Sequence, residues 1–159
     1  MTDPASYIQP LLELCFVAGE AICSHYHQPG ETAFEDKGDS SPVTEADLES
    51  HRILDDGLAS LSGNLPVLSE ECTAQELSQR RRWKRFWMVD PLDGTKEFIG
   101  GTGEFTINIA LIDDHRPILG VLYVPLSRTA YAGIPGVGAT LHQRDEQGRW
   151  TEQATTCRA

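Results

Sequence analysis

Residues 86–98 read FWMVDPLDGTKEF, and this stretch decides how the chain is expected to fold. Its first four residues are apolar, which predicts a buried β-strand. The strand leads directly into Asp90 and Pro91, and Pro91 favours an extended conformation for the residue before it. Gly94 permits a sharp turn. We therefore expect the carboxylates of Asp90 and Asp93 on one side of a tight loop.

The chemistry of this loop favours a divalent cation. The amides of Gly94 and Thr95 are expected to point the same way and to form an anion site. Two carboxylates about 4 Å apart repel by roughly 4 kcal/mol at an effective dielectric near 20, unless one is protonated or a cation lies between them. Oxygen ligands without nearby His or Cys favour Mg²⁺, Ca²⁺ or Mn²⁺ over zinc. Glu70 and Glu71 follow a separate apolar run at residues 65–68, and they strengthen the case for Mg²⁺.

Two of these features also have a structural interpretation. Asp-Pro followed by Asp-Gly-Thr is ordinary turn chemistry, in which aspartates accept hydrogen bonds from backbone amides. Thr44 and the acid three residues later, Asp47, form a capping box at a helix start. The roles are compatible, because such a cap leaves Asp47 at the helix N-terminus, where it could orient Thr95 or a water. The acid pair after a second strand makes the functional interpretation of the aspartate loop the favoured one.

The rest of the chain supplies two helices followed mainly by strands. Apolar residues at helical spacing predict helices over residues 6–26 and from residue 42 to Gly63-Asn64. Further strands are expected near residues 32–35 and over residues 106–112, 118–124 and 128–132, and a surface helix or loop over residues 74–84. This order predicts an α+β fold in which layered helices pack on a mostly antiparallel sheet.

The amino-acid composition and charge of the chain disfavour some classes of function. The chain has 159 residues, which predicts one domain, with 13 Lys and Arg against 24 Asp and Glu and a formal charge of −11. This excess of acidic residues disfavours unspecific binding of nucleic acid or anionic lipid. A small anionic substrate can still bind if a cation lies between the substrate and the protein. No apolar run of about 18 residues and no basic signal segment occur, and the four cysteines form no Cys-x-x-Cys pair. We expect a cytoplasmic protein with reduced thiols.

The end of the chain is unusual for a complete domain. Residues 133–138 are rich in glycine, and residues 143–159 carry little periodic apolar content. No helix is expected after the last predicted strand. We therefore expect residues 1–159 to form a single domain that is truncated before its C-terminal half. Such a truncation leaves a sheet edge or an apolar face exposed and favours self-association.

Three segments together resemble the inositol monophosphatase superfamily. They are SPVTEAD at residues 41–47, VLSEE at residues 67–71 and WMVDPLDGTKEF at residues 87–98, in the family's order and at family-like separations. Lys-Glu-Phe after Asp-Gly-Thr resembles the bisphosphate nucleotidase branch, whereas inositol monophosphatases more often have Thr-Asn-Phe there. Residues 103–112 and 117–121 also fit that branch. The resemblance implies the N-terminal part of the αβαβα inositol monophosphatase-like fold.

The resemblance also implies roles for individual residues. One Mg²⁺ would be held by Glu70, Asp90 and the main-chain oxygen of Leu92, and a second would be shared by Asp90 and Asp93. Asp47 and Thr95 would activate the attacking water. The amides of Gly94 and Thr95 would hold the phosphate, and the implied substrate-binding residues are Glu70, Leu92, Asp93, Gly94 and Thr95.

The reaction implied by the resemblance is hydrolysis of adenosine 3′,5′-bisphosphate to AMP and phosphate, with lithium as an inhibitor. The resemblance also implies peripheral membrane association, which occurs in the family. The family places another metal-binding aspartate in a Trp-Asp-x-Ala segment late in its C-terminal half, and residues 1–159 contain no such segment. The second cation would then lack one ligand. The alternatives are an inositol or sugar monophosphatase and, from another class, an inactive metal-binding fragment.

Overall fold

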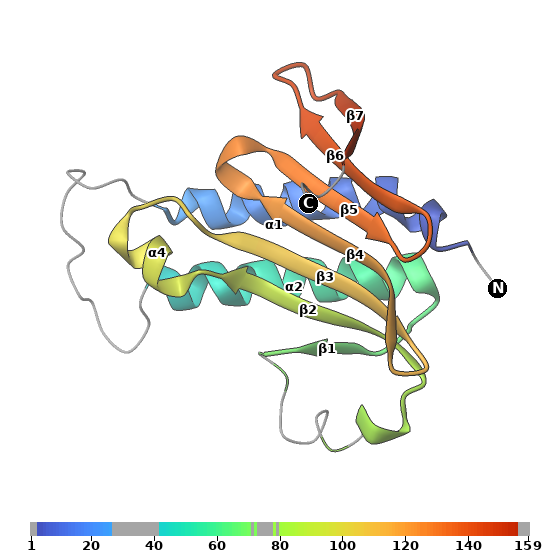
Figure 1. Cartoon of the computed structure of the whole chain (residues 1–159). Coiled ribbons are helices and arrows are strands. Elements are labelled where there is room, and N and C mark those ends of the chain that lie inside the picture. Colours follow the sequence, from blue (N-terminus) through green and yellow to red (C-terminus); the bar gives the residue numbers. More distant parts are fainter. Residues whose placement is uncertain (1–2, 27–41, 71, 73–77, 79, 156–159) are drawn as a thin grey trace.

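A computed structural model of the chain describes residues 3–26, 42–70, 72, 78 and 80–155. Two long helices, α1 (Ile8–Ser24) and α2 (Pro42–Ser62), lie along a seven-stranded sheet (Figure 1). The strands are β1 (Val67–Ser69), β2 (Arg85–Asp93), β3 (Thr106–Asp113), β4 (Arg116–Val124), β5 (Thr129–Ile134), β6 (Gly138–Arg144) and β7 (Trp150–Thr155). The short helices are η1 (Pro4–Tyr7), η2 (Arg80–Arg82), α4 (Thr95–Gly100) and η3 (Pro125–Ser127).

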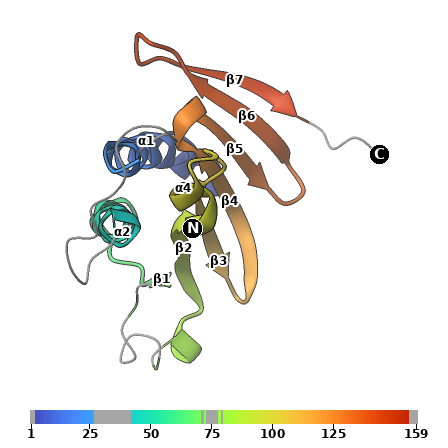
Figure 2. The same ribbon diagram turned by 90° about the vertical axis from the view of Figure 1, so that its left-hand side faces the viewer.

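The sheet keeps the order of the chain from β1 to β7. β1 pairs with β2 in parallel, and every other neighbouring pair is antiparallel. Figure 2 shows α1 and α2 next to each other on one face of the sheet. The structure therefore confirms the predicted α+β class, with layered helices packed on a mostly antiparallel sheet.

The core forms between this helix pair and the inner face of the sheet. On α1 the buried positions recur at helical spacing, and on α2 Leu54 and Leu58 are fully buried. Gly19 permits close approach of α1 to β4, because a Cβ there would lie 2.6 Å from the ring of Tyr123. Trp87 is fully buried and packs edge-on against Tyr7, 5.5 Å between ring centroids. Trp87 is thus a packing residue.

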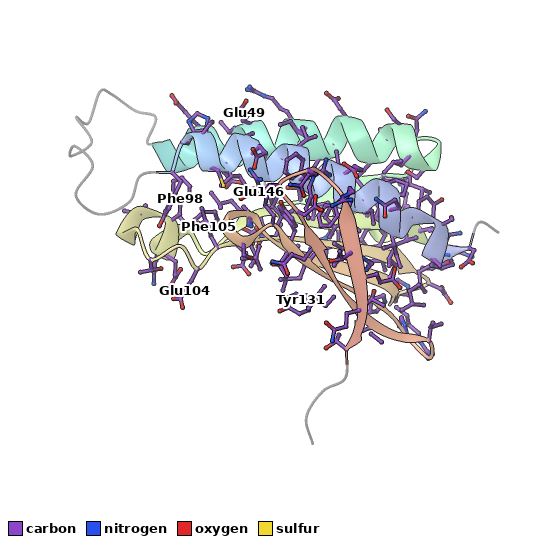
Figure 3. The ribbon with its side chains drawn as sticks, turned by 90° about the horizontal axis from the view of Figure 1, so that it is seen from above. Glu49, Phe98, Glu104, Phe105, Tyr131 and Glu146 are labelled. Carbon is purple, nitrogen blue, oxygen red and sulfur yellow. The ribbon has the colours of Figure 1, made fainter. Side chains whose placement is uncertain are left out.

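The outer face of the sheet carries exposed apolar side chains. Met88, Leu122 and Tyr131 are 45%, 39% and 45% exposed, and each lies between buried neighbours on its strand. Figure 3 shows Tyr131 on the side of the sheet away from the helices. This face is therefore an apolar surface that the described residues leave open to solvent.

Several predicted boundaries differ from the structure. β6 and β7 were not predicted, because their sequence is polar and β7 is exposed along most of its length. The strand predicted near residues 32–35 lies outside the described residues. Of the surface helix or loop predicted over residues 74–84, residues 74–77 and 79 also lie outside them, and Arg80–Arg82 form η2. In the described part of the chain, no helix combines the length and apolarity needed to span a membrane. The cytoplasmic location and the truncated single domain stay predictions.

Candidate metal and phosphate site

The two aspartates of the motif lie at the end of β2, so the prediction that they lie in a tight loop is wrong. Asp90 and Asp93 belong to the strand, which is irregular between them. Asp90 pairs with Asn108 and Asp93 pairs with Thr106, so three steps along β2 match two steps along β3. Residues three apart on a regular strand face opposite sides of the sheet. The extra residue of this β-bulge removes that alternation and places both carboxylates within reach of each other.

Hydrogen bonds hold the bulged segment from two sides. The fully buried Ser50 of α2 donates from Oγ to the main-chain oxygen of Pro91, at 2.9 Å. The amide of Leu92 donates to Oδ1 of Asp90, at 3.2 Å. The position of the Asp90 carboxylate is therefore fixed both by its own strand and, through the backbone, by the helix behind the sheet.

The parallel pairing of β1 with β2 brings in a third carboxylate. The register aligns Ser69 with Val89, so Glu70 leaves the end of β1 beside Asp90. Burial raises the pKa of Asp90, and the charges of Glu70 and then Asp93 raise it further, whereas the Leu92 amide lowers it. The structure thus brings Glu70 and Asp93 close enough to Asp90 for their charges to raise its pKa. A cation between them would relieve this repulsion.

Gly94 and Thr95 connect the bulged strand to α4. Gly94 has a φ of 96°, and a Cβ there would lie 2.7 Å from the main-chain oxygen of Glu104, so a larger residue does not fit. Gly94 is the N-cap of α4, and the exposed Thr95 is its first residue. Phe98 of α4 packs against Phe105 at 5.2 Å, which anchors this helix (Figure 3). The phosphate-binding role of the two amides stays a prediction.

Asp47 lies near the start of α2, but this helix begins at Pro42, so Thr44 lies inside it and the predicted capping box with Thr44 at the helix start is wrong. Its Oδ1 atom is buried. α2 and α4 are in contact, so Asp47 and Thr95 belong to touching elements. The side chain of Thr44 and the whole of Glu71 lie outside the described part of the structure. The roles of Asp47 and Thr95 in activating water stay predictions.

The donor atoms around Asp90 fit a hard divalent cation. They are carboxylate oxygens and, in the same segment, the main-chain oxygen of Leu92, which are the ligands that Mg²⁺ prefers. Among the described residues, no group of three or more His, Cys, Asp or Glu side chains is arranged to hold a metal ion.

A groove of about 830 Å³ begins at Glu70 and Asp90 and extends over the outer face of the sheet. Its lining also includes Arg80 and Asn108 on β3, and it is mostly apolar. No role was predicted for Ser50 or Asn108. Asn108 lies inside a segment that supported the family resemblance, but only the strand register shows that it faces Asp90.

Comparisons with known proteins agree with this architecture. The model of the inositol monophosphatase family matches residues 3–159. The 3′(2′),5′-bisphosphate nucleotidase CysQ of Escherichia coli strain K12 is 46% identical over 129 residues, which cover 81% of this chain and 52% of that protein. CysQ of Haemophilus influenzae is 34% identical over 148 residues, covering 93% and 54%.

Solved structures show the same relationship. The crystal structure of CysQ from Bacteroides thetaiotaomicron matches with a TM-score of 0.74 and 41% identity, over 87% of this chain and 49% of that one. SuhB of Mycobacterium tuberculosis matches with a TM-score of 0.71 and 26% identity, over 100% and 54%. The chain thus spans about half the length of the relatives that it matches. It belongs to the inositol monophosphatase family, and its sequence resembles the CysQ members of that family.

Proposed function

We propose that the protein acts as a Mg²⁺-dependent phosphatase that hydrolyses the 3′-phosphate of adenosine 3′,5′-bisphosphate to give AMP and phosphate. The observation that carries this proposal is the approach of Glu70 and Asp93 to the partly buried Asp90. The names of the similar CysQ proteins, 3′(2′),5′-bisphosphate nucleotidases, support the substrate class.

The acidic side chains of the site provide the proposed cation ligands. Glu70, Asp90 and the main-chain oxygen of Leu92 would hold one Mg²⁺, and Asp90 and Asp93 would share a second. When bound, Mg²⁺ lowers the pKa of water and neutralises charge on the phosphoryl group. The need for a cation also explains how a chain of formal charge −11 accepts an anionic substrate.

The remaining residues of the motif orient the reactants. The hydroxyl of Thr95 positions a water for attack on phosphorus, and the carboxylate of Asp47 accepts its proton. The amides of Gly94 and Thr95 donate hydrogen bonds to phosphate oxygens. The bond between phosphorus and the 3′ oxygen breaks in line with the attack, and the 3′ oxygen gains a proton from solvent water.

The test is phosphate release from adenosine 3′,5′-bisphosphate, measured with Mg²⁺ and with EDTA. We expect release with Mg²⁺ only, inhibition by Li⁺, and slower release from inositol 1-phosphate. Asp93→Asn is expected to abolish release, whereas the exposed Asp56→Asn on α2 serves as the matched control and keeps it. Near-normal release by Asp93→Asn would refute the assignment of Asp93.

The other outcomes separate the alternatives. Faster release from inositol 1-phosphate would favour the inositol or sugar monophosphatase function. A rise in melting temperature with Mg²⁺, without any phosphate release, would favour an inactive metal-binding fragment. Phosphate release that EDTA leaves unchanged would contradict the cation requirement.

A further inference from the structure

We infer that Asn108 is a positioning residue that holds the Asp93 carboxylate beside Asp90, so that the two aspartates can share one cation. The inference rests on the proposed cation site. Asn108 itself is not a proposed ligand, because its contact with the site is a hydrogen bond to one of the carboxylates.

The strand register gives Asn108 this position. Asn108 lies on β3 directly opposite Asp90, at the last regular pair before the bulge. Its Nδ2 donates to Oδ2 of Asp93 at 3.0 Å, so its side chain reaches across the bulge from one aspartate to the other. A bulge leaves the strand locally without regular pairing. This side-chain bond replaces the missing backbone constraint at the point where the carboxylates must be held together.

The amide group of Asn108 is itself oriented. Oγ1 of Thr106 donates to Oδ1 of Asn108 at 3.5 Å, a long hydrogen bond that occupies the carbonyl side of the amide. The NH₂ side is thereby directed to Asp93. A neutral donor suits this place, because it orients a carboxylate without cancelling the negative charge that attracts a cation.

The bond leaves Asp93 with free coordinating capacity. A carboxylate offers about four lone-pair sites on two oxygens. In the described part of the structure, Asn108 is the sole hydrogen-bond partner of the Asp93 carboxylate, and it engages Oδ2. Oδ1 therefore stays available to a cation, while rotation of the carboxylate away from Asp90 is opposed. Asn108 also lines the groove that contains Asp90 and Glu70, and its hydrogen bond connects the Asp93 carboxylate to that groove.

The experiment measures Mn²⁺ binding by the full chain with electron paramagnetic resonance, which requires no turnover. Loss of a residue that orients a metal ligand typically weakens metal binding roughly 10- to 100-fold. We expect Asn108→Leu to raise the Mn²⁺ dissociation constant by about that factor. Gln143→Leu, an amide-to-leucine change at an exposed position of β6, is the matched control and should bind Mn²⁺ like wild type.

A second variant and a double mutant separate positioning from folding. Asn108→Ser, whose side chain is too short to reach Asp93, should weaken Mn²⁺ binding as Asn108→Leu does, with a melting temperature close to that of wild type. In an Asp93→Asn background, Asn108→Leu should change the remaining Mn²⁺ affinity less than about twofold, because the orienting bond then has no ligand to act on.

The outcomes are distinguishable. Wild-type Mn²⁺ affinity in both Asn108 variants would overturn the inference and leave the proposed function standing. An equal effect of Asn108→Leu with and without Asp93 would also overturn it, because the effect would then be structural. Absence of Mn²⁺ binding by the wild-type chain would overturn the proposed cation site and this inference together.

Discussion

Ser50→Ala is expected to destabilise the protein, because it breaks the bond that joins α2 to the bulged end of β2. The fully buried Ser50 hydroxyl donates to the main-chain oxygen of Pro91 at 2.9 Å, and Pro91 is itself buried. Removing the hydroxyl leaves that oxygen without this donor in a site closed to water. An unsatisfied buried polar group costs about 1–3 kcal/mol. For a chain of this size, each kcal/mol lowers the melting temperature by about 2–4 °C.

The assay is urea and thermal unfolding of the wild type, Ser50→Ala and Ser60→Ala. Ser60 lies on the same helix and donates to the main-chain oxygen of Asp56 at 2.9 Å, but it is exposed. Because water replaces that bond and alanine favours helices, Ser60→Ala should leave the free energy of unfolding within about 0.5 kcal/mol of wild type. Equal free energies for the two variants would refute the reasoning that the buried bond fixes the aspartate segment.

Three further predictions concern charge, packing and association. Asp90 has a raised pKa in the folded protein, so its ionisation destabilises the fold as pH rises through that pKa. In urea unfolding of the metal-free protein, Asp90→Asn should therefore raise the free energy of unfolding more at pH 7 than at pH 4. A larger gain at pH 4 would contradict this. Arg144 pairs with Glu13 and lies 4.0 Å from the centroid of the Phe16 ring, so Arg144→Ala should lower the free energy of unfolding by about 1–2 kcal/mol. The Arg149 side chain is 76% exposed, so Arg149→Ala should lower the free energy of unfolding less than Arg144→Ala does. A larger loss for Arg149→Ala would count against a role of Arg144 in holding β6 to α1. The apolar outer face of the sheet predicts self-association. Light scattering should therefore give wild type a mass above the 17.5 kDa of one chain, and Leu122→Glu a lower mass than wild type. A monomeric wild type would contradict the prediction.

The fold class and the site segment could be predicted because their signals are local. Helical periodicity identified α1 and α2, and the apolar run before Asp90 identified β2. The hairpin of β6 and β7 could not be predicted, because its polar residues lack an apolar pattern. Its stability comes from contacts with α1 that are distant in sequence, such as the hydrogen bond from the Trp150 ring nitrogen to Glu13, at 2.9 Å.

The geometry of the site depended on pairing that local sequence does not reveal. Asp-Pro-Leu-Asp-Gly fits a tight turn, yet the pairing of Asp90 with Asn108 and of Asp93 with Thr106 makes it a bulged strand. Ser50 reaches this segment from 41 residues away and Asn108 reaches Asp93 from 15 residues away. Contacts of this kind are settled by tertiary structure, so the sequence identified the acidic residues but not those that orient them.

A titration of the Asp90 carboxyl group by carbon-13 NMR tests most directly whether the three acids act as one cation site. With wild type in metal-free buffer, the pKa should lie above the ordinary aspartate value, and Glu70→Gln or added Mg²⁺ should each lower it. An Asp90 pKa that neither Glu70→Gln nor Mg²⁺ changes would show that these carboxylates are independent, and it would contradict the account.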